Sequence, residues 1–370
     1  MILMKVLQYW IRSDEPTNFP AITVDSIASR LILKVSSTSR TMEKCFFAFT
    51  MILLYFRYLI KLCGISLDAV FTVDANTILY FLCQISLFSL FYQKYNHTFV
   101  EKVHDLWNEL QIELDYETRK YFWTHKVFYY SVTVFSKICT LIYDLGNVYY
   151  YWPYKDSDSL QSPFDYWTWV MRVPIIYSYY ICHDFILCDL SIAAQTAIQN
   201  IESQLKRLYK ESLKDERALH FTIIHDLRIK YLQTHRLVNK MNELMSPCLL
   251  VFLIIFTNYF IRMFYLILFV QQSRFVQMYQ LSGCIGSFIL IITIIHLTAQ
   301  VYLKSQRLLM AAYKLSLKTD YLKVLNEITL FVNCNEIAFS LGGICMITSS
   351  AITTFFSILA TLIIAIPSFG

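Results

Sequence analysis

The last apolar stretch of the chain carries hydroxyl side chains at helical spacing. They follow one another at steps of four, three, four and seven residues: Ser350, Thr354, Ser357, Thr361 and Ser368. In a helix this spacing places all five on one face, over roughly 27 Å at a rise of about 1.5 Å per residue. A polar face on a helix that is apolar enough to cross a bilayer is typical of a helix that lines a water-filled pore.

The hydroxyl stripe is interrupted between Thr361 and Ser368, where Ile364 and Ala365 occupy the same face. A ring of apolar side chains is hard to hydrate, so we expect a gate there that closes by dewetting. Phe369, a large apolar side chain one turn further out, is the competing candidate for the gate. Serine and threonine in membrane helices also donate to their own i−4 carbonyl or join two helices, and this structural alternative stays open for each hydroxyl.

A second set of residues able to bind a ligand lies inside three other apolar stretches. A charge at mid-membrane costs at least about 2.5 to 3.5 kcal/mol, so such groups normally face the interior of a helix bundle. Most lie in the outer half, and each group shares one helical face: Lys137 and Asp144; Trp169, Arg172, Tyr179 and His183; Asn258, Arg262 and Tyr265. We expect them to line a cavity for a small polar or amphipathic ligand. Alternatively, Lys137, Asp144, Asp184 and Arg262 pair with one another and hold the bundle together.

Composition defines the class of protein that must position these residues. Of 370 residues, 56% are hydrophobic and only 16% are charged, with a mean hydropathy of +0.45. These values describe an all-α integral membrane protein. Seven stretches have the roughly 20 mainly apolar residues that a spanning helix needs. They are Cys45 to Leu62, Val70 to Tyr92, Thr124 to Leu145, Trp167 to Leu190, Cys248 to Gln271, Leu281 to Leu303, and Ile337 to Pro367.

The connections between these stretches alternate in their content of basic residues. One side carries 24 lysines and arginines, whereas the other carries only Lys155 and Arg274. The positive-inside rule then predicts a cytoplasmic N-terminus and an extracellular C-terminus in a multi-pass protein of the plasma membrane. This orientation is opposite to that of a G-protein-coupled receptor. We expect no removable signal peptide, because residues 1–11 are broken by Lys5 and Gln8 and have no small-residue cleavage site.

These predictions divide the chain into six segments. The expected division is a cytoplasmic N-terminal segment at 1–44, spans one to four at 45–190, a cytoplasmic helical anchor at 191–247, spans five and six at 248–303, a second anchor segment at 304–336, and a pore-lining seventh span at 337–370. The first anchor segment holds neither glycine nor proline up to Ser246, so we expect long helical extensions into the cytoplasm. Near its end an apolar stripe requires a partner helix, which the second anchor segment supplies: Leu227, Tyr231, Thr234, Val238, Met241 and Met245.

Catalytic chemistry finds no support in the sequence. The histidines match no zinc-enzyme spacing, and no phosphate-binding loop, nucleophile elbow or paired catalytic carboxylates occur. We therefore expect no enzyme activity, no metal, no cofactor and no nucleic-acid partner, with membrane lipid as the surroundings. Most of the ten cysteines lie inside apolar segments, as small buried hydrophobes do, and only Cys63 and Cys284 fall near outward ends, where their pairing is left open.

Two parts of the chain carry a resemblance to a known family. The run Gly343-Ile-Cys-Met-Ile-Thr348, followed by Thr361-Leu-Ile-Ile-Ala-Ile-Pro-Ser-Phe369, is similar to the C-terminal signature of insect-type gustatory receptors, which reads Thr-Tyr, five apolar residues, Gln-Phe. Leu362, Pro367 and Ser368 depart from it, as in a divergent member. The segment from Leu227 to Ser246 also resembles the family's segment before its fifth span, with matching residues at Arg228, His235, Asn242 and Ser246.

The resemblance implies a ligand-gated, non-selective cation channel that detects a small-molecule tastant from outside the cell. In that family four subunits, alike or related, pack their cytoplasmic helices into a common anchor, and the last helix lines the pore. The resemblance thus implies a homotetramer or a heterotetramer. Two other classes of protein stay open, because a seven-helix secondary transporter would carry similar midplane charges and a G-protein-coupled receptor has the same number of spans.

Overall fold

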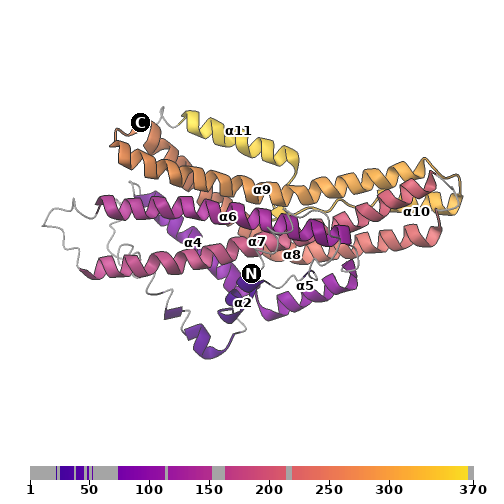
Figure 1. The fold of residues 1–370 in the computed structure, drawn as a ribbon, viewed down its shortest axis with the longest axis horizontal. Coiled ribbons are helices and arrows are strands. Elements are labelled where there is room, and N and C mark those ends of the chain that lie inside the picture. Colours follow the sequence, from indigo (N-terminus) through magenta and orange to yellow (C-terminus); the bar gives the residue numbers. More distant parts are fainter. Residues whose placement is uncertain are drawn as a thin grey trace.

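A computed structural model of the chain describes residues 22, 26–36, 39–45, 48–49, 52, 74–112, 116–151, 163–213 and 219–365. Its regular structure is almost entirely helical (Figure 1). In chain order the elements are α2 (Ile27–Lys34), α4 (Asp74–Lys94), α5 (His97–Glu109), α6 (Tyr116–Tyr151), α7 (Pro163–Ser212), α8 (Phe221–Phe269), α9 (Arg274–Ser316), α10 (Leu322–Val332), β1 (Ser340–Leu341), β2 (Cys345–Met346) and α11 (Ser349–Ala365).

The long helices α6, α7, α8 and α9 run side by side along the longest axis of the molecule (Figure 1). The connection between α8 and α9 and the end of α11 lie at one end of this bundle, on the left of the view. At the opposite end α7, α8 and α9 extend together beyond the other helices, and α10 packs against α8 and α9 there. We call this part, residues 196–213, 219–245 and 304–336, the helical extension.

Among the described residues, three helical segments are long and apolar enough to cross a membrane: Ser178–Ser212, Phe221–Phe269 and Arg274–Ser316. A shorter apolar helix covers Ser349–Thr361. The expected helical membrane class thus agrees with the structure. The number of seven spans stays a prediction, as does the orientation of the ends, and the first expected span, Cys45 to Leu62, lies mostly outside the described residues.

Local sequence signals define where several helices begin. The Ser273 side chain accepts a hydrogen bond from Val276 N at the start of α9, and Asn96 accepts one from Phe99 N at the start of α5. Such caps satisfy backbone donors that have no partner within the helix. α7 begins at Pro163, a residue that is well tolerated in the first turn because its missing N–H would have no helical partner there.

The apolar stripe predicted near the end of the first anchor segment lies on α8 and is buried. Leu227, Tyr231 and Met241 are each 2% exposed or less. The facing residues come from α9, α10 and the segment after α10. The Tyr231 hydroxyl lies 2.9 Å from Ser305 Oγ and donates to Asn335 O at 2.8 Å. The prediction that the chain between 304 and 336 supplies the facing helices is therefore confirmed.

Glycine allows α6 and α9 to approach closely in the middle of the bundle. A Cβ atom added to Gly286 of α9 would lie 2.7 Å from the Ser136 carbonyl oxygen of α6. The Ser136 hydroxyl in turn donates to the Gly286 carbonyl at 2.6 Å. Small residues that bring two backbones together, with a hydroxyl bonding across, are a common way to pack membrane helices.

The prediction of one continuous helix from Ile337 to Pro367 is wrong over its first third. Residues 335–348 form no helix but a short antiparallel hairpin of β1 and β2, and α11 begins only at Ser349. Gly342 and Gly343 form the turn of this hairpin with φ angles of 60° and 74°, in the left-handed region that favours glycine, which a continuous right-handed helix does not contain. Apolar composition alone did not reveal this turn.

Candidate functional site

Two charged side chains pair in the middle of the bundle. Lys137 Nζ of α6 lies 2.7 Å from Asp184 Oδ2 of α7, and the two side chains are 6% and 2% exposed. The ammonium group also lies 5.2 Å from the ring centre of Tyr180 and 5.1 Å from that of Phe256 on α8. This buried ion pair, held between aromatic rings, joins three helices. Each charge is compensated by the other in otherwise apolar surroundings.

His183 lies next to this pair on α7 and is 2% exposed. Its ring stacks on Phe91 of α4 with the centroids 4.0 Å apart, and Phe88, one turn earlier, lies 5.1 Å away. Its Nδ1 atom has no hydrogen-bond partner among the described residues. A buried polar atom without a partner costs free energy, so it is a natural contact for a ligand or a water molecule.

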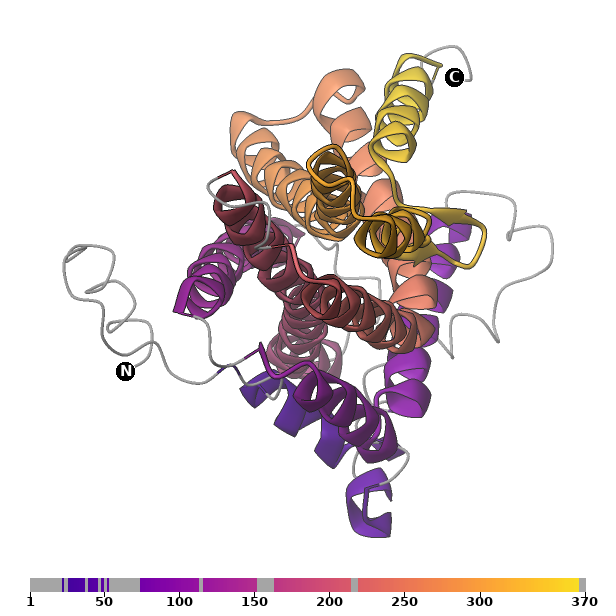
Figure 2. The ribbon, with the colours of Figure 1, turned by 90° about the vertical axis from the view of Figure 1, so that its right-hand side faces the viewer.

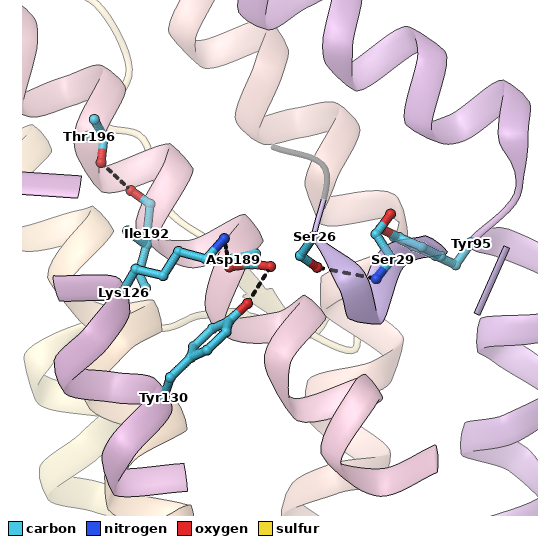
Figure 3. Close-up of polar contacts among 8 residues, drawn as sticks. All are labelled: Ser26, Ser29, Tyr95, Lys126, Tyr130, Asp189, Ile192 and Thr196. Carbon is cyan, nitrogen blue, oxygen red and sulfur yellow. Dashed lines mark hydrogen bonds and ion pairs between the residues drawn. The ribbon is translucent and has the colours of Figure 1, made fainter. Parts of the chain in front are cut away.

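A second buried ion pair lies along the same two helices towards the helical extension (Figure 3). The Asp189 carboxylate of α7 is 2.8 Å from Lys126 Nζ and accepts a hydrogen bond from the Tyr130 hydroxyl at 2.7 Å. Lys126 and Tyr130 are one turn apart on α6, so they reach the same carboxylate. The Tyr130 ring stacks on Phe185 with the centroids 4.0 Å apart, which fixes the position of the hydroxyl.

The N-terminal helix α2 packs against α7 beside this second pair. Its cap residue, Ser26, accepts a hydrogen bond from Ser29 N at 3.2 Å (Figure 3), and the Tyr95 hydroxyl from the end of α4 donates to Ser29 Oγ at 2.7 Å. Sequence reasoning did not single out Lys126 or Asp189. Both are ionisable residues within the limits of apolar stretches, so the same rule that selected Lys137 would have found them.

The structure separates the predicted ligand residues into two groups. On α6 and α7, Lys137 pairs with Asp184, Asp144 is half-buried two turns further along α6, and the Tyr179 ring meets Phe88 edge-on at 5.6 Å. Trp169 and Arg172 lie on α7, but their side chains are not described. On α8, Asn258 is half-buried, whereas Arg262 and Tyr265 are exposed on the outside of the single chain. Lys137 thus forms one of the ion pairs that the structural alternative expects, and its contact with a ligand stays a prediction.

The predicted hydroxyl stripe lies on the exposed face of α11. Ser350, Thr354, Ser357 and Thr361 are all exposed, while Leu359 is buried against the bundle. α11 packs on α9 and α8 and lies at the periphery of the molecule in the end view of Figure 2. Ile364 and Ala365 belong to the end of α11 without described side chains, and Ser368 and Phe369 lie outside the described residues.

Three of these hydroxyls donate to carbonyls of their own helix. Thr354, Ser357 and Thr361 each bond the carbonyl four residues earlier at 2.9 Å, as the structural alternative for single hydroxyls expects. Because each proton is directed back into the helix, the oxygen lone pairs are left as acceptors on the outer side. The exposed face is therefore a row of acceptor oxygens, which suits a cation better than an anion.

In the helical extension α8 and α10 are joined by a cluster around one carboxylate. Glu327 Oε1 accepts a hydrogen bond from Arg228 Nε at 2.5 Å and lies 3.0 Å from His225 Nδ1. Burial raises the pKa of Glu327, but the hydrogen bonds and charges of Arg228 and His225 outweigh it, so the pKa lies below its ordinary value of 4.5. Glu327 therefore stays ionised and keeps the two helices together.

The described part of the chain offers no group of three or more His, Cys, Asp or Glu side chains that could hold a metal ion. Cys284, one of the two cysteines whose pairing was left open, is a buried free thiol, and Cys63 lies outside the described residues. The polar clusters described above are thus ion pairs and hydrogen-bonded groups between helices.

No family model matches this chain, and no curated protein matches its sequence. Its fold, however, is similar to solved structures of a chemosensory receptor. The structure of the insect olfactory receptor OR5 from Machilis hrabei aligns over 99% of this chain and 99% of that chain, with a TM-score of 0.66 and 13% sequence identity. The structure of the same receptor in complex with eugenol aligns over 93% of this chain and 96% of that chain, with a TM-score of 0.65. The likeness shows a common fold over nearly the whole chain.

Proposed function

We propose that this chain is a subunit of a chemosensory, ligand-gated, non-selective cation channel, with a small-molecule tastant as its ligand. The observation that carries the proposal is the exposed row of acceptor oxygens on α11, in a chain whose fold matches an insect olfactory receptor along its full length. In a lone bundle this face would lie against lipid. In a tetramer whose subunits turn this face of α11 toward one another, the four helices would surround water.

The proposed pore lies on the axis of a tetramer, lined by α11 from each subunit. Hydroxyl oxygens replace part of the hydration shell of an ion, and no ring of charges selects among cations, so the proposed selectivity is loose. Ile364 and Ala365 form the proposed gate, with Phe369 as the competing position. The helical extension, whose α8 stripe from Leu227 to Met245 packs within the chain, is the proposed anchor between subunits in the cytoplasm.

The proposed ligand enters from the end of the bundle where α8 and α9 connect, which faces outward in this topology. Its site lies around α7, with Tyr179 on the side of α4 and the Lys137–Asp184 pair on the side of α6 among its contacts. Aromatic rings and a buried His183 Nδ1 suit a small amphipathic molecule with one polar group. Binding opens the channel only if the ligand prefers the open arrangement, because differential affinity alone shifts a two-state equilibrium.

A ligand-panel recording from cells that express the chain alone, and then with a related receptor, tests the function. We expect a cation current that appears with ligand and reverses near zero voltage in mixed sodium and potassium. A current that requires one coupling ion would instead identify a secondary transporter. A response carried only by G proteins would identify the other seven-helix class and contradict the channel.

A topology measurement tests the orientation on which the pore and the ligand site depend. An epitope at the N-terminus should be reached only after permeabilisation, whereas one after Gly370 should be reached on intact cells. Swapped accessibility would contradict the proposed orientation. It would also place the proposed ligand site around α7 on the wrong side for a tastant outside the cell.

A further inference from the structure

The hairpin that precedes α11 is fixed to α8 by five hydrogen bonds. Gly342 N donates to Ser246 O at 3.0 Å, and Gly343 N donates to Ser246 Oγ at 2.8 Å. Ser340 Oγ donates to Ser246 Oγ at 2.9 Å, Ser340 N donates to Asn242 Oδ1 at 3.1 Å, and Asn242 Nδ2 donates to Ser340 Oγ at 3.0 Å. We call Asn242, Ser246, Ser340, Gly342 and Gly343 the hairpin dock.

The hairpin dock lies at the one position where α8 contains a proline. Pro247 follows Ser246 directly and has no N–H, so the Glu243 carbonyl four residues earlier loses its helical donor. Lys94 Nζ at the end of α4 takes that place, 3.0 Å from Glu243 O. A helix bends most easily where its ladder of hydrogen bonds is interrupted, so this is the natural hinge of α8.

The turn of the hairpin fits closely against α8. Gly342 has a φ angle of 60°, and a Cβ atom added to it would lie 2.6 Å from Leu250 Cδ2, one turn beyond Ser246. Ser246 itself is only 7% exposed. The hairpin therefore has little freedom to slide on α8, and it leads within a few residues into Ser349, the first residue of α11.

We propose that the hairpin dock couples the bend of α8 to the position of α11, so that movement in the ligand-binding bundle is transmitted to the proposed pore helix. The inference rests on the proposed channel function. α4 contributes through Lys94, α8 through its hinge at Pro247, and α11 through the hairpin that precedes it. A rigid connection at a hinge transmits movement because neither partner can shift without the other.

Replacing both dock serines by cysteine tests this coupling. Ser246→Cys with Ser340→Cys places two sulfur atoms where two hydroxyl oxygens lie 2.9 Å apart, close enough for a disulfide after a small shift. In the reduced double variant the thiols are weak donors and acceptors, so the dock is loosened. We expect ligand-evoked current, normalised to surface protein, to fall by about tenfold, because three of the five dock hydrogen bonds use a hydroxyl of Ser246 or Ser340 and are weakened.

Oxidation should then restore the current of the double variant to within about twofold of the parent, because a covalent bond replaces the lost hydrogen bonds. Each single cysteine variant should show no recovery under the same oxidation. Peptide mapping measures the disulfide directly, independently of any current. If the double variant does not reach the surface, Ser340→Ala alone, which removes two of the five hydrogen bonds, should reduce the current several-fold.

Three outcomes would overturn the inference. Loss of the remaining current on oxidation would mean that the hairpin must leave α8 when the channel opens. Equal currents in both redox states, with the disulfide formed, would mean that the dock only supports the fold. If the parent chain reaches the surface, alone or with a partner, and never passes ligand-evoked current, the proposed function is contradicted, and this inference with it.

Discussion

Lys137 of α6 and Asp184 of α7 form an ion pair with 2.7 Å between Nζ and Oδ2, and both side chains are almost fully buried. Removing one partner leaves an uncompensated charge in the bundle. We therefore expect Lys137→Met alone, or Asp184→Leu alone, to destabilise the protein by about 3 to 5 kcal/mol. The double variant should be close to the parent, because an apolar pair removes both charges. Thermal unfolding in detergent measures the cycle.

The same double variant separates a structural role from a role in ligand binding. If the pair contacts the ligand, the double variant should be stable and reach the cell surface, but its half-maximal response should require at least about tenfold more ligand. An unchanged response would assign the pair to the fold alone. A double variant as unstable as the single ones would contradict the pairing itself.

Tyr179 and Tyr265 were both predicted to contact the ligand, but only Tyr179 lies within the bundle. Tyr179 meets Phe88 edge-on at 5.6 Å, whereas Tyr265 is 39% exposed on α8. We expect Tyr179→Ala to lower the apparent ligand affinity by about tenfold and Tyr265→Ala to change it by less than about twofold. Dose–response recordings with matched surface levels measure both. The reverse order would move the ligand site to the outer face of α8.

The lowered pKa of Glu327 lets us predict how the stability of the helical extension depends on pH. Its pKa lies below the ordinary 4.5, so the folded protein favours the charged carboxylate more than the unfolded chain does. This stabilisation is fully present above pH 4.5 and is lost as pH falls through the lowered folded-state pKa. Glu327→Gln should therefore be less stable at pH 7 by about 1 to 3 kcal/mol and lose less on acidification. Melting temperatures from pH 7 to pH 4 report both effects.

The exposed Asp320→Asn serves as the control for this pH series. It removes a carboxylate close in sequence to α10, so it should leave both the stability at neutral pH and the acid response near those of the parent. Equal acid responses of the parent and Glu327→Gln would contradict the assigned role of Glu327.

The two glycines of the hairpin provide a matched pair of variants. Both have positive φ angles, but a Cβ atom at Gly343 meets nothing within 4 Å, whereas one at Gly342 meets Leu250. We expect Gly343→Ala to cost about 1 to 2 kcal/mol from backbone strain alone. Gly342→Ala should cost more, and adding Leu250→Ala should recover part of the loss. Equal losses in thermal unfolding, without recovery, would contradict the close contact with α8.

Periodicity predicted the helical parts of this fold well. The stripe from Leu227 to Met245 is buried where a 3.6-residue period places it, because burial of one helix face is what that pattern records. Hydropathy did not indicate the turn at Gly342, because the residues from Ile337 to Pro367 are as apolar as a spanning helix. Two adjacent glycines were the only local signal that the helix does not continue.

The candidate sites were harder to predict than the fold. Helical spacing placed Lys137 on a face toward the bundle and left Asp144, Asp184 and Arg262 as possible partners. It did not select Asp184, since the register of two helices depends on packing across the whole interface. It likewise placed Arg262 and Tyr265 on one face of α8 without revealing that this face is turned outward. The dock between Ser246 and Gly343 joins residues 97 apart in the chain, which no local pattern can indicate.

The most direct test of the central claim asks whether the hydroxyl face of α11 lines the pore. Thr354→Cys places a thiol on that exposed face, and Ile352→Cys places one on the opposite side, packed on the bundle. A small cationic thiol reagent, added during ligand-evoked current in a parent background that the reagent leaves unaffected, should block Thr354→Cys channels and spare Ile352→Cys channels. Block at neither position, or equal block at both, would contradict the account.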